Sequence, residues 1–162
     1  MYKLDILDIL LDIILRPRLE HILKAPEPSN SHYRSMPYRP DDDEIASVFT
    51  AINDDIFGGI LQQPKIRLSR VKKTWGWCQG DYEMRDGQHW PSIKEIIVYP
   101  MYPGIHMFVA ILGHEMVHQW QWTVNSIERL AMDKKPLMSH GPTFYQWRKA
   151  FEKRGLPLAR SI

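Results

Sequence analysis

The stretch "GHEMVHQW" at residues 113–120 places two histidines four positions apart, with a glutamate directly after the first. On an α-helix, residues four apart lie one above the other, so His114 and His118 can bind the same ion. Zn²⁺ accepts imidazole nitrogen, and catalytic zinc sites use three protein ligands and keep one position open. Glu115 would then lie beside the ion as a general base. The alternative is an ordinary helix that carries three polar side chains.

The residues around this stretch predict a helix over 104–124. Phe108, Leu112 and Met116 recur at helical spacing and predict a buried face, with the two histidines on a neighbouring stripe. Gly113 is unexpected inside a helix because glycine costs about 1 kcal/mol relative to alanine there. Close packing of this helix against the sheet would explain it.

A third zinc ligand has to come from downstream, where the candidates are Glu128, Asp133 and His140. Glu128 continues a helical surface, and Asp133 precedes two lysines, as is typical of a solvated loop. His140 stands in "SHGPTF", where Gly141 and Pro142 fit a turn into a last helix over "TFYQWRKAFEKRG". We expect His140 to be the third ligand.

The sequence upstream predicts a helix followed by a small sheet, hence an α+β fold. Acidic residues at 41–44 precede apolar residues at helical spacing, and Gly58 and Gly59 end that helix. Three strands are expected between residues 60 and 100, in "PKIRLSRV", "TWGWCQGDY" and "KEIIVYP". We expect them to form an antiparallel sheet packed against the helices, with "MRDGQHWPS" as a loop.

The N-terminal residues 1–23 form a separate helical segment in this interpretation. Within "LDILDILLDIIL", Asp5, Asp8 and Asp12 share one helical face and leave a Leu/Ile face to be buried. The run is too short and too acidic for a membrane span, and no small-residue cleavage site follows. We therefore expect a cytoplasmic protein without a membrane segment. The helix packs on the main domain or mediates an oligomer or partner contact.

Residues 24–40 contain four prolines and polar residues, which predicts a linker, so residues 41–162 form the main domain. The formal charge of +2 is too small to indicate nucleic-acid binding by itself. A single cysteine, Cys78, excludes an internal disulfide and a zinc ribbon with several cysteines. Cys78 as a nucleophile is a weaker interpretation than Cys78 as a small core residue of a strand.

The pair "HEMVH" and "HGPTFYQW" resembles the SprT/Spartan-like metallopeptidase family, in which HExxH and a later HGxxF supply three zinc-binding histidines. "FTAINDDIFGGIL" and "TWGWCQG" also resemble family segments, so the resemblance covers about residues 41–155. It implies a minimal zincin-like fold, a cleft above the sheet, and zinc-dependent proteolysis, often of DNA-bound proteins. The cysteine-rich zinc ribbon of the cellular bacterial members is not expected in this chain.

The leading hypothesis is therefore a zinc metallopeptidase that binds a protein or peptide along the "TWGWCQGDY" strand, which contains Cys78. Trp122 and Trp147 are candidates for the walls of the cleft, and Tyr145 for stabilising an oxyanion. Two other functions remain open. One is a zinc-stabilised binding or scaffold protein that does not cleave, although such a site needs no base at Glu115. The other is a DNA-associated module that acts through its basic patches.

Overall fold

The computed structural model of the protein describes residues 18–24, 36–70 and 74–160. The helix expected within residues 1–17 and most of the expected linker lie outside these described residues. In chain order the elements are α2 (Leu19–Ile22), α3 (Asp42–Phe57), β1 (Ile66–Leu68), β2 (Gly76–Arg85), β3 (Gln88–Val98), α4 (Ile105–Trp120), the π-helix η2 (Gln121–Asn125), α5 (Ser126–Ala131), α6 (Pro142–Tyr145) and α7 (Arg148–Glu152).

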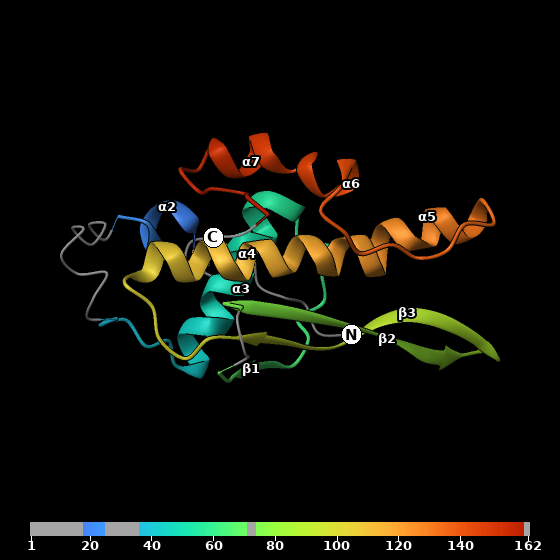
Figure 1. Cartoon of the computed structure of the whole chain (residues 1–162), viewed down its shortest axis with the longest axis horizontal. Coiled ribbons are helices and arrows are strands. Elements are labelled where there is room, and N and C mark those ends of the chain that lie inside the picture. The colour runs from blue at the N-terminus through green and yellow to red at the C-terminus, as the bar shows by residue number, and fades with distance from the viewer. Residues whose placement is uncertain (1–17, 25–35, 71–73, 161–162) are drawn as a thin grey trace, which may run out of the picture.

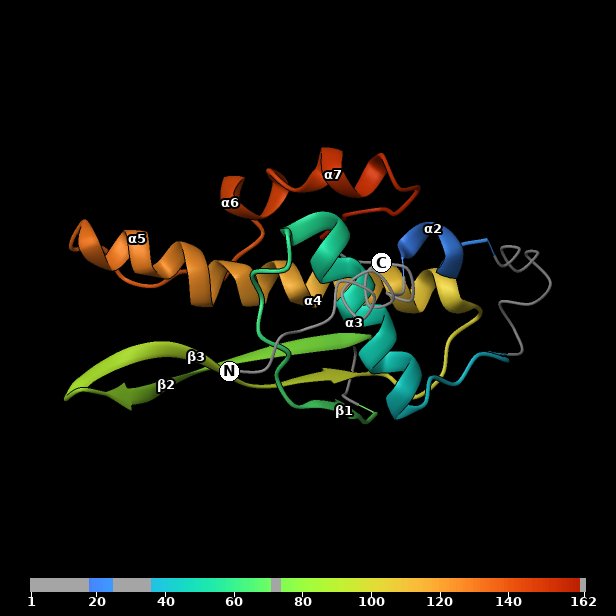
Figure 2. The ribbon, with the colours of Figure 1, turned by 180° about the vertical axis from the view of Figure 1, so that it is seen from behind.

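Helix α4 occupies the middle layer of the fold. The sheet lies on one side of it, and α6 and α7 cover the opposite side (Figure 1). Helix α3 crosses α4, as the view from behind shows (Figure 2). Because it is covered on several sides, every residue of α4 from Phe108 to Gln119 is buried. The predicted apolar face therefore accounts for only part of the buried surface of this helix. Both histidines and the glutamate of the HExxH stretch are buried as well.

Helix α3 forms as its sequence predicts. The Asp41 side chain accepts a hydrogen bond from the Glu44 backbone N–H, and the Glu44 carboxylate accepts one from Asp41 N–H, which completes a capping box. Gly58 ends the helix with φ of 69°, a left-handed conformation that favours glycine. The buried Asn53 amide then makes two hydrogen bonds with the backbone of Leu61 and fixes the chain as it leaves the helix.

The sheet is mixed, so the prediction of an antiparallel sheet is wrong. Its order is β1-β3-β2, with β2 antiparallel and β1 parallel to β3. Strands β2 and β3 are consecutive and pair as a hairpin. Strand β1 therefore pairs with the other edge of β3, where Ile66 is the partner of Ile96. Alternation of apolar and polar residues predicts a strand but neither its partner nor its direction.

The predicted loop at residues 84–92 is also wrong. Strand β2 continues to Arg85 and β3 begins at Gln88, so the connection is the two-residue turn Asp86–Gly87. Both turn residues have positive φ, 49° and 77°, as a tight hairpin turn requires. The Asp-Gly dipeptide is a strong hairpin signal, and it outweighed the polar character of the flanking residues.

Two helix predictions need correction at their ends. The helix that contains the histidines does not stop near residue 124 but continues through η2 into α5. The expected last helix is two short ones, α6 and α7, separated at Gln146 and Trp147. At this break the Trp147 ring packs against Phe57 and Trp120, with ring centroids 4.6 and 5.1 Å apart.

The described N-terminal residues belong to the packed structure. Leu19 of α2 is 1% exposed, and its backbone N–H donates to the carboxylate of Asp55 in α3. Tyr38 forms an isolated antiparallel bridge with Tyr102. Within the described parts of the chain, every helix is too short or too polar to cross a membrane.

Candidate metal centre

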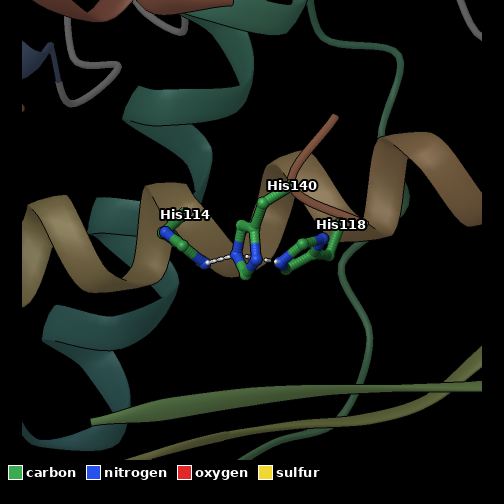
Figure 3. Close-up of side chains that lie close together, drawn as sticks. All are labelled: His114, His118 and His140. Atoms are coloured by element: carbon green, nitrogen blue, oxygen red, sulfur yellow. Dashed lines mark hydrogen bonds between the residues drawn. The ribbon is translucent and has the colours of Figure 1, made fainter. Parts of the chain in front are cut away.

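Three histidines meet on one side of α4. His114 and His118 lie one turn apart on the helix, and His140 extends toward them from the segment that precedes α6 (Figure 3). The Nε2 atom of His140 lies 2.9 Å from Nε2 of His114 and 3.1 Å from Nε2 of His118. The structure therefore brings together the three residues that the sequence singled out.

The spacing of these nitrogens fits a metal ion. Zn–N bonds of about 2.0–2.1 Å at a tetrahedral angle place two ligand nitrogens about 3.3 Å apart. The separations from His140 in the structure, 2.9 and 3.1 Å, are shorter by a few tenths of an ångström, and the ligand nitrogens of all three histidines lie within 4.8 Å of one another. In the described part of the chain, these histidines are the one group of three or more ligand side chains close enough to hold a metal ion.

Burial keeps the imidazoles in the form that binds metal. It lowers the pKa of His114 to about 3 and that of His118 to about 4, with the neighbouring histidines adding to the effect. Burial also lowers the pKa of His140. A neutral imidazole keeps a lone pair on one ring nitrogen, and metal ligation needs that lone pair.

Phe144 of α6 supports all three rings from one side. It is fully buried, and its ring centroid lies 4.8 to 4.9 Å from those of His114, His118 and His140. Gly141 and Pro142 start α6 directly after His140, so the turn that aims the third histidine and the aromatic residue that supports it share one short segment. This arrangement agrees with the sequence argument for that turn.

Glu115 lies next to the sheet. Its side chain is 6% exposed and accepts a hydrogen bond from the backbone of Cys78 in β2. Burial raises the pKa of this carboxyl to about 8, although the Cys78 hydrogen bond opposes the shift. A carboxyl that titrates near neutral pH suits transfer of a proton in both directions.

Gly76 makes room for this carboxyl. A Cβ added at Gly76 would lie 2.7 Å from Oε1 of Glu115 and 3.0 Å from Cγ2 of Ile111. Any larger residue would push against the helix that bears the histidines. Strand β2 and helix α4 are therefore in close contact at Glu115.

Trp122 follows the histidines and reaches the same strand. Its indole N–H donates to the backbone carbonyl of Asp81 at 2.9 Å, and its ring packs against Tyr82 at 5.4 Å. Strand β2 is at an edge of the sheet, and a Cβ added at Gly80 would lie 2.7 Å from Cε2 of Trp122, so the Trp122 ring packs directly against this edge strand. This position is compatible with the wall of a cleft.

The other candidate residues, Trp147, Tyr145 and Cys78, have their main contacts with residues other than the three histidines. Trp147 packs into the aromatic cluster at the break between α6 and α7. Tyr145 packs against Phe144, and the Arg148 guanidinium lies 4.4 Å over its ring. Cys78 is buried, and burial raises the pKa of its thiol, with Glu115 adding to the shift. Two neighbours therefore contact the centre directly. The Cys78 backbone contacts Glu115, and Phe144 contacts the three histidines.

Gln121 is a further residue of the site that was not predicted from the sequence. This residue is fully buried, and its Oε1 atom lies 2.9 Å from Nδ1 of His118. The available signal was its position three residues after His118, on the same helical face. By contrast, Glu128 and Asp133, the carboxylates considered as third ligands, are exposed.

Comparison with known proteins gives no relative from which a role could be transferred. The site is therefore defined by its own residues, burial and distances. No protein-family model, no curated protein and no solved structure matches this chain.

Proposed function

We propose that this protein is a zinc-dependent metallopeptidase with a minimal zincin-like domain. The observation that supports the proposal is the convergence of three neutral imidazole Nε2 atoms at a helix whose buried Glu115 carboxyl contacts an edge strand. A donor set of three histidines is one that catalytic zinc sites use, with the fourth position left for water or substrate. A site that served stability alone would need no proton acceptor at Glu115.

The chain's own residues divide the chemistry of peptide hydrolysis between them. His114, His118 and His140 would hold the ion. A bound Zn²⁺ supplies Lewis acidity toward a peptide carbonyl and toward water. Glu115 accepts the proton of the attacking water and returns it to the leaving amine, which its pKa near 8 favours. Phe144 keeps the three imidazoles packed on one side.

The substrate of this proposal is an extended peptide that pairs with β2. An edge strand offers unpaired backbone N–H and C=O groups, which give affinity without requiring one side-chain sequence. The Cys78 backbone contacts Glu115, so a peptide along this edge would pass the base. Trp122 would border the same peptide, because its indole already bonds Asp81 of β2.

The experiment is a cleavage assay on purified protein with an unfolded protein substrate, with and without chelator and with and without DNA. We expect cleavage that the chelator abolishes and zinc restores. Glu115→Gln should retain about one zinc per chain and lose at least about 100-fold in rate, because the ion stays and the base is removed. The matched control is Glu128→Gln, which changes an exposed glutamate and should leave the rate unaltered.

Two outcomes would replace this proposal. A wild-type protein that binds zinc and cleaves nothing at neutral pH would be a zinc-stabilised binding or scaffold protein. A protein that cleaves nothing but binds DNA with strong salt dependence, even as metal-free Glu115→Ala, would be a DNA-associated module.

A further inference from the structure

Gln121, the first residue of the π-helix η2, connects His118 to the segment that carries His140 through its amide. It is fully buried. Its Oε1 atom lies 2.9 Å from Nδ1 of His118 and 3.2 Å from the backbone N of Ser139. Its Nε2 atom donates to the backbone carbonyl of Ser139 and to Oγ1 of Thr143, both at 2.8 Å. The amide therefore has two acceptor contacts and two donor contacts, so it is fully satisfied.

The backbone of Ser139 fixes which way this amide points. Ser139 N–H can only donate and Ser139 C=O can only accept. Rotating the Gln121 amide by 180° would place its NH₂ group against that N–H and its oxygen against that carbonyl. The orientation with Oε1 toward His118 is therefore the one that satisfies all four contacts.

This orientation determines where the proton of His118 lies. The amide oxygen can only accept, so Nδ1 of His118 must carry the hydrogen and donate it to Oε1 of Gln121. A neutral imidazole has one ring hydrogen, so Nε2 of His118 is left with its lone pair. That nitrogen is the one that faces His140.

The other half of the amide holds the chain on which the third histidine lies. Ser139 directly precedes His140, and Thr143 is in the first turn of α6. The geometry points to Gln121 as a positioning residue that sets the tautomer of His118 and ties His140 to the same helix. This inference rests on the metal centre of the proposed function and extends it to a residue outside the ligand set.

Gln119 offers a matched control. It is the same residue type, two positions earlier in the chain, and it is 2% exposed. Its amide also holds a loop, because Nε2 donates to the Gln62 carbonyl at 2.7 Å. This hydrogen bond goes to Gln62 and not to a histidine or to the segment that carries His140, so Gln119→Met removes an amide hydrogen bond of a buried residue without removing a contact to a histidine.

The test compares wild type, Gln121→Met, Gln121→Glu and Gln119→Met in the full chain. In the metal-free proteins above pH 7, nitrogen NMR reports the tautomer of His118. We expect the Nδ1–H form in wild type, Gln119→Met and Gln121→Glu, which keeps an acceptor, and a mixture in Gln121→Met. Competition with a chelator should show zinc affinity about 10–100-fold weaker in Gln121→Met and within about threefold of wild type in Gln119→Met.

A folded Gln121→Met that keeps the Nδ1–H tautomer and wild-type zinc affinity would overturn the inference. If Gln121→Met does not fold, Gln121→Glu decides, because loss of the Nδ1–H form there would contradict the role of the acceptor. The NMR comparison needs neither zinc nor activity. A protein that binds no zinc would therefore refute the proposed function while the tautomer still tests Gln121, and a zinc protein without protease activity would leave this inference standing.

Discussion

A Cβ built on Gly113 would lie 2.5 Å from Cε1 of Phe151, so α4 and α7 meet here with backbone against ring. The Phe151 side chain is fully buried, and a ring in a packed core has little room to move aside. This close approach explains a glycine inside a helix, and its packing partner is helix α7 rather than the sheet that we expected. It also sets the distance between the helix that bears two histidines and the C-terminal helices that follow the third.

Gly113→Ala should therefore destabilise the protein although alanine favours a helix. Overpacking costs about 1–3 kcal/mol, and improved helix propensity returns about 1 kcal/mol. We expect the free energy of unfolding to fall by up to about 2 kcal/mol in urea denaturation. Combining Gly113→Ala with Phe151→Leu should give a smaller loss than the sum of the two single changes. A more stable Gly113→Ala protein would show that the ring moves freely.

Local signals in the sequence predicted the helices better than the sheet. The limits of α3 depend on neighbours in sequence, namely the acids at 41–44 and Gly58, and the structure confirms them. The pairing of β1 with β3 joins Ile66 to Ile96, thirty residues apart, and strand periodicity contains no information on it. The hairpin was predictable from Asp86–Gly87, a local signal that favours a two-residue turn over the longer loop that we expected.

The same division applies to the site. The spacing of His114 and His118 was enough to place both on one face of a helix. The prediction of His140 depended on a turn at Gly141 and Pro142. The structure places the His140 imidazole beside those of His114 and His118. The depth of Glu115 beneath the sheet and the four contacts of Gln121 depend on how distant segments pack, which spacing along the chain does not determine.

Zinc content should separate ligands from neighbours. His114→Ala, His118→Ala and His140→Ala should each bind zinc much more weakly, because two imidazoles leave the ion with a poorly fixed geometry. Glu128→Ala and Asp133→Ala change exposed side chains and should retain about one zinc per chain. Metal analysis after dialysis against a weak chelator measures this. Full zinc in both His114→Ala and His118→Ala would refute the centre.

Cys78→Ala should retain activity and zinc. The thiol is buried, and burial and Glu115 both raise its pKa, so it stays protonated at neutral pH and is a poor nucleophile. The contact with Glu115 comes from the Cys78 backbone, which alanine preserves. The measurement is the cleavage rate of the variant under reducing conditions. A loss of more than about 100-fold in a folded, zinc-loaded variant would instead support catalysis by the thiol.

Gly76→Ala should separate the base from the metal. The added Cβ would lie 2.7 Å from Oε1 and 2.9 Å from Cγ of Glu115, so the carboxyl has to move. The three atoms nearest to this Cβ belong to Glu115 and Ile111 rather than to a histidine, and we expect zinc content to stay near one per chain. The cleavage rate should fall at least about tenfold, since a displaced base transfers protons poorly. Metal analysis and cleavage on the same preparation check this. Loss of zinc together with activity would show that the strand supports the whole centre, and unchanged activity would show that Glu115 tolerates the shift.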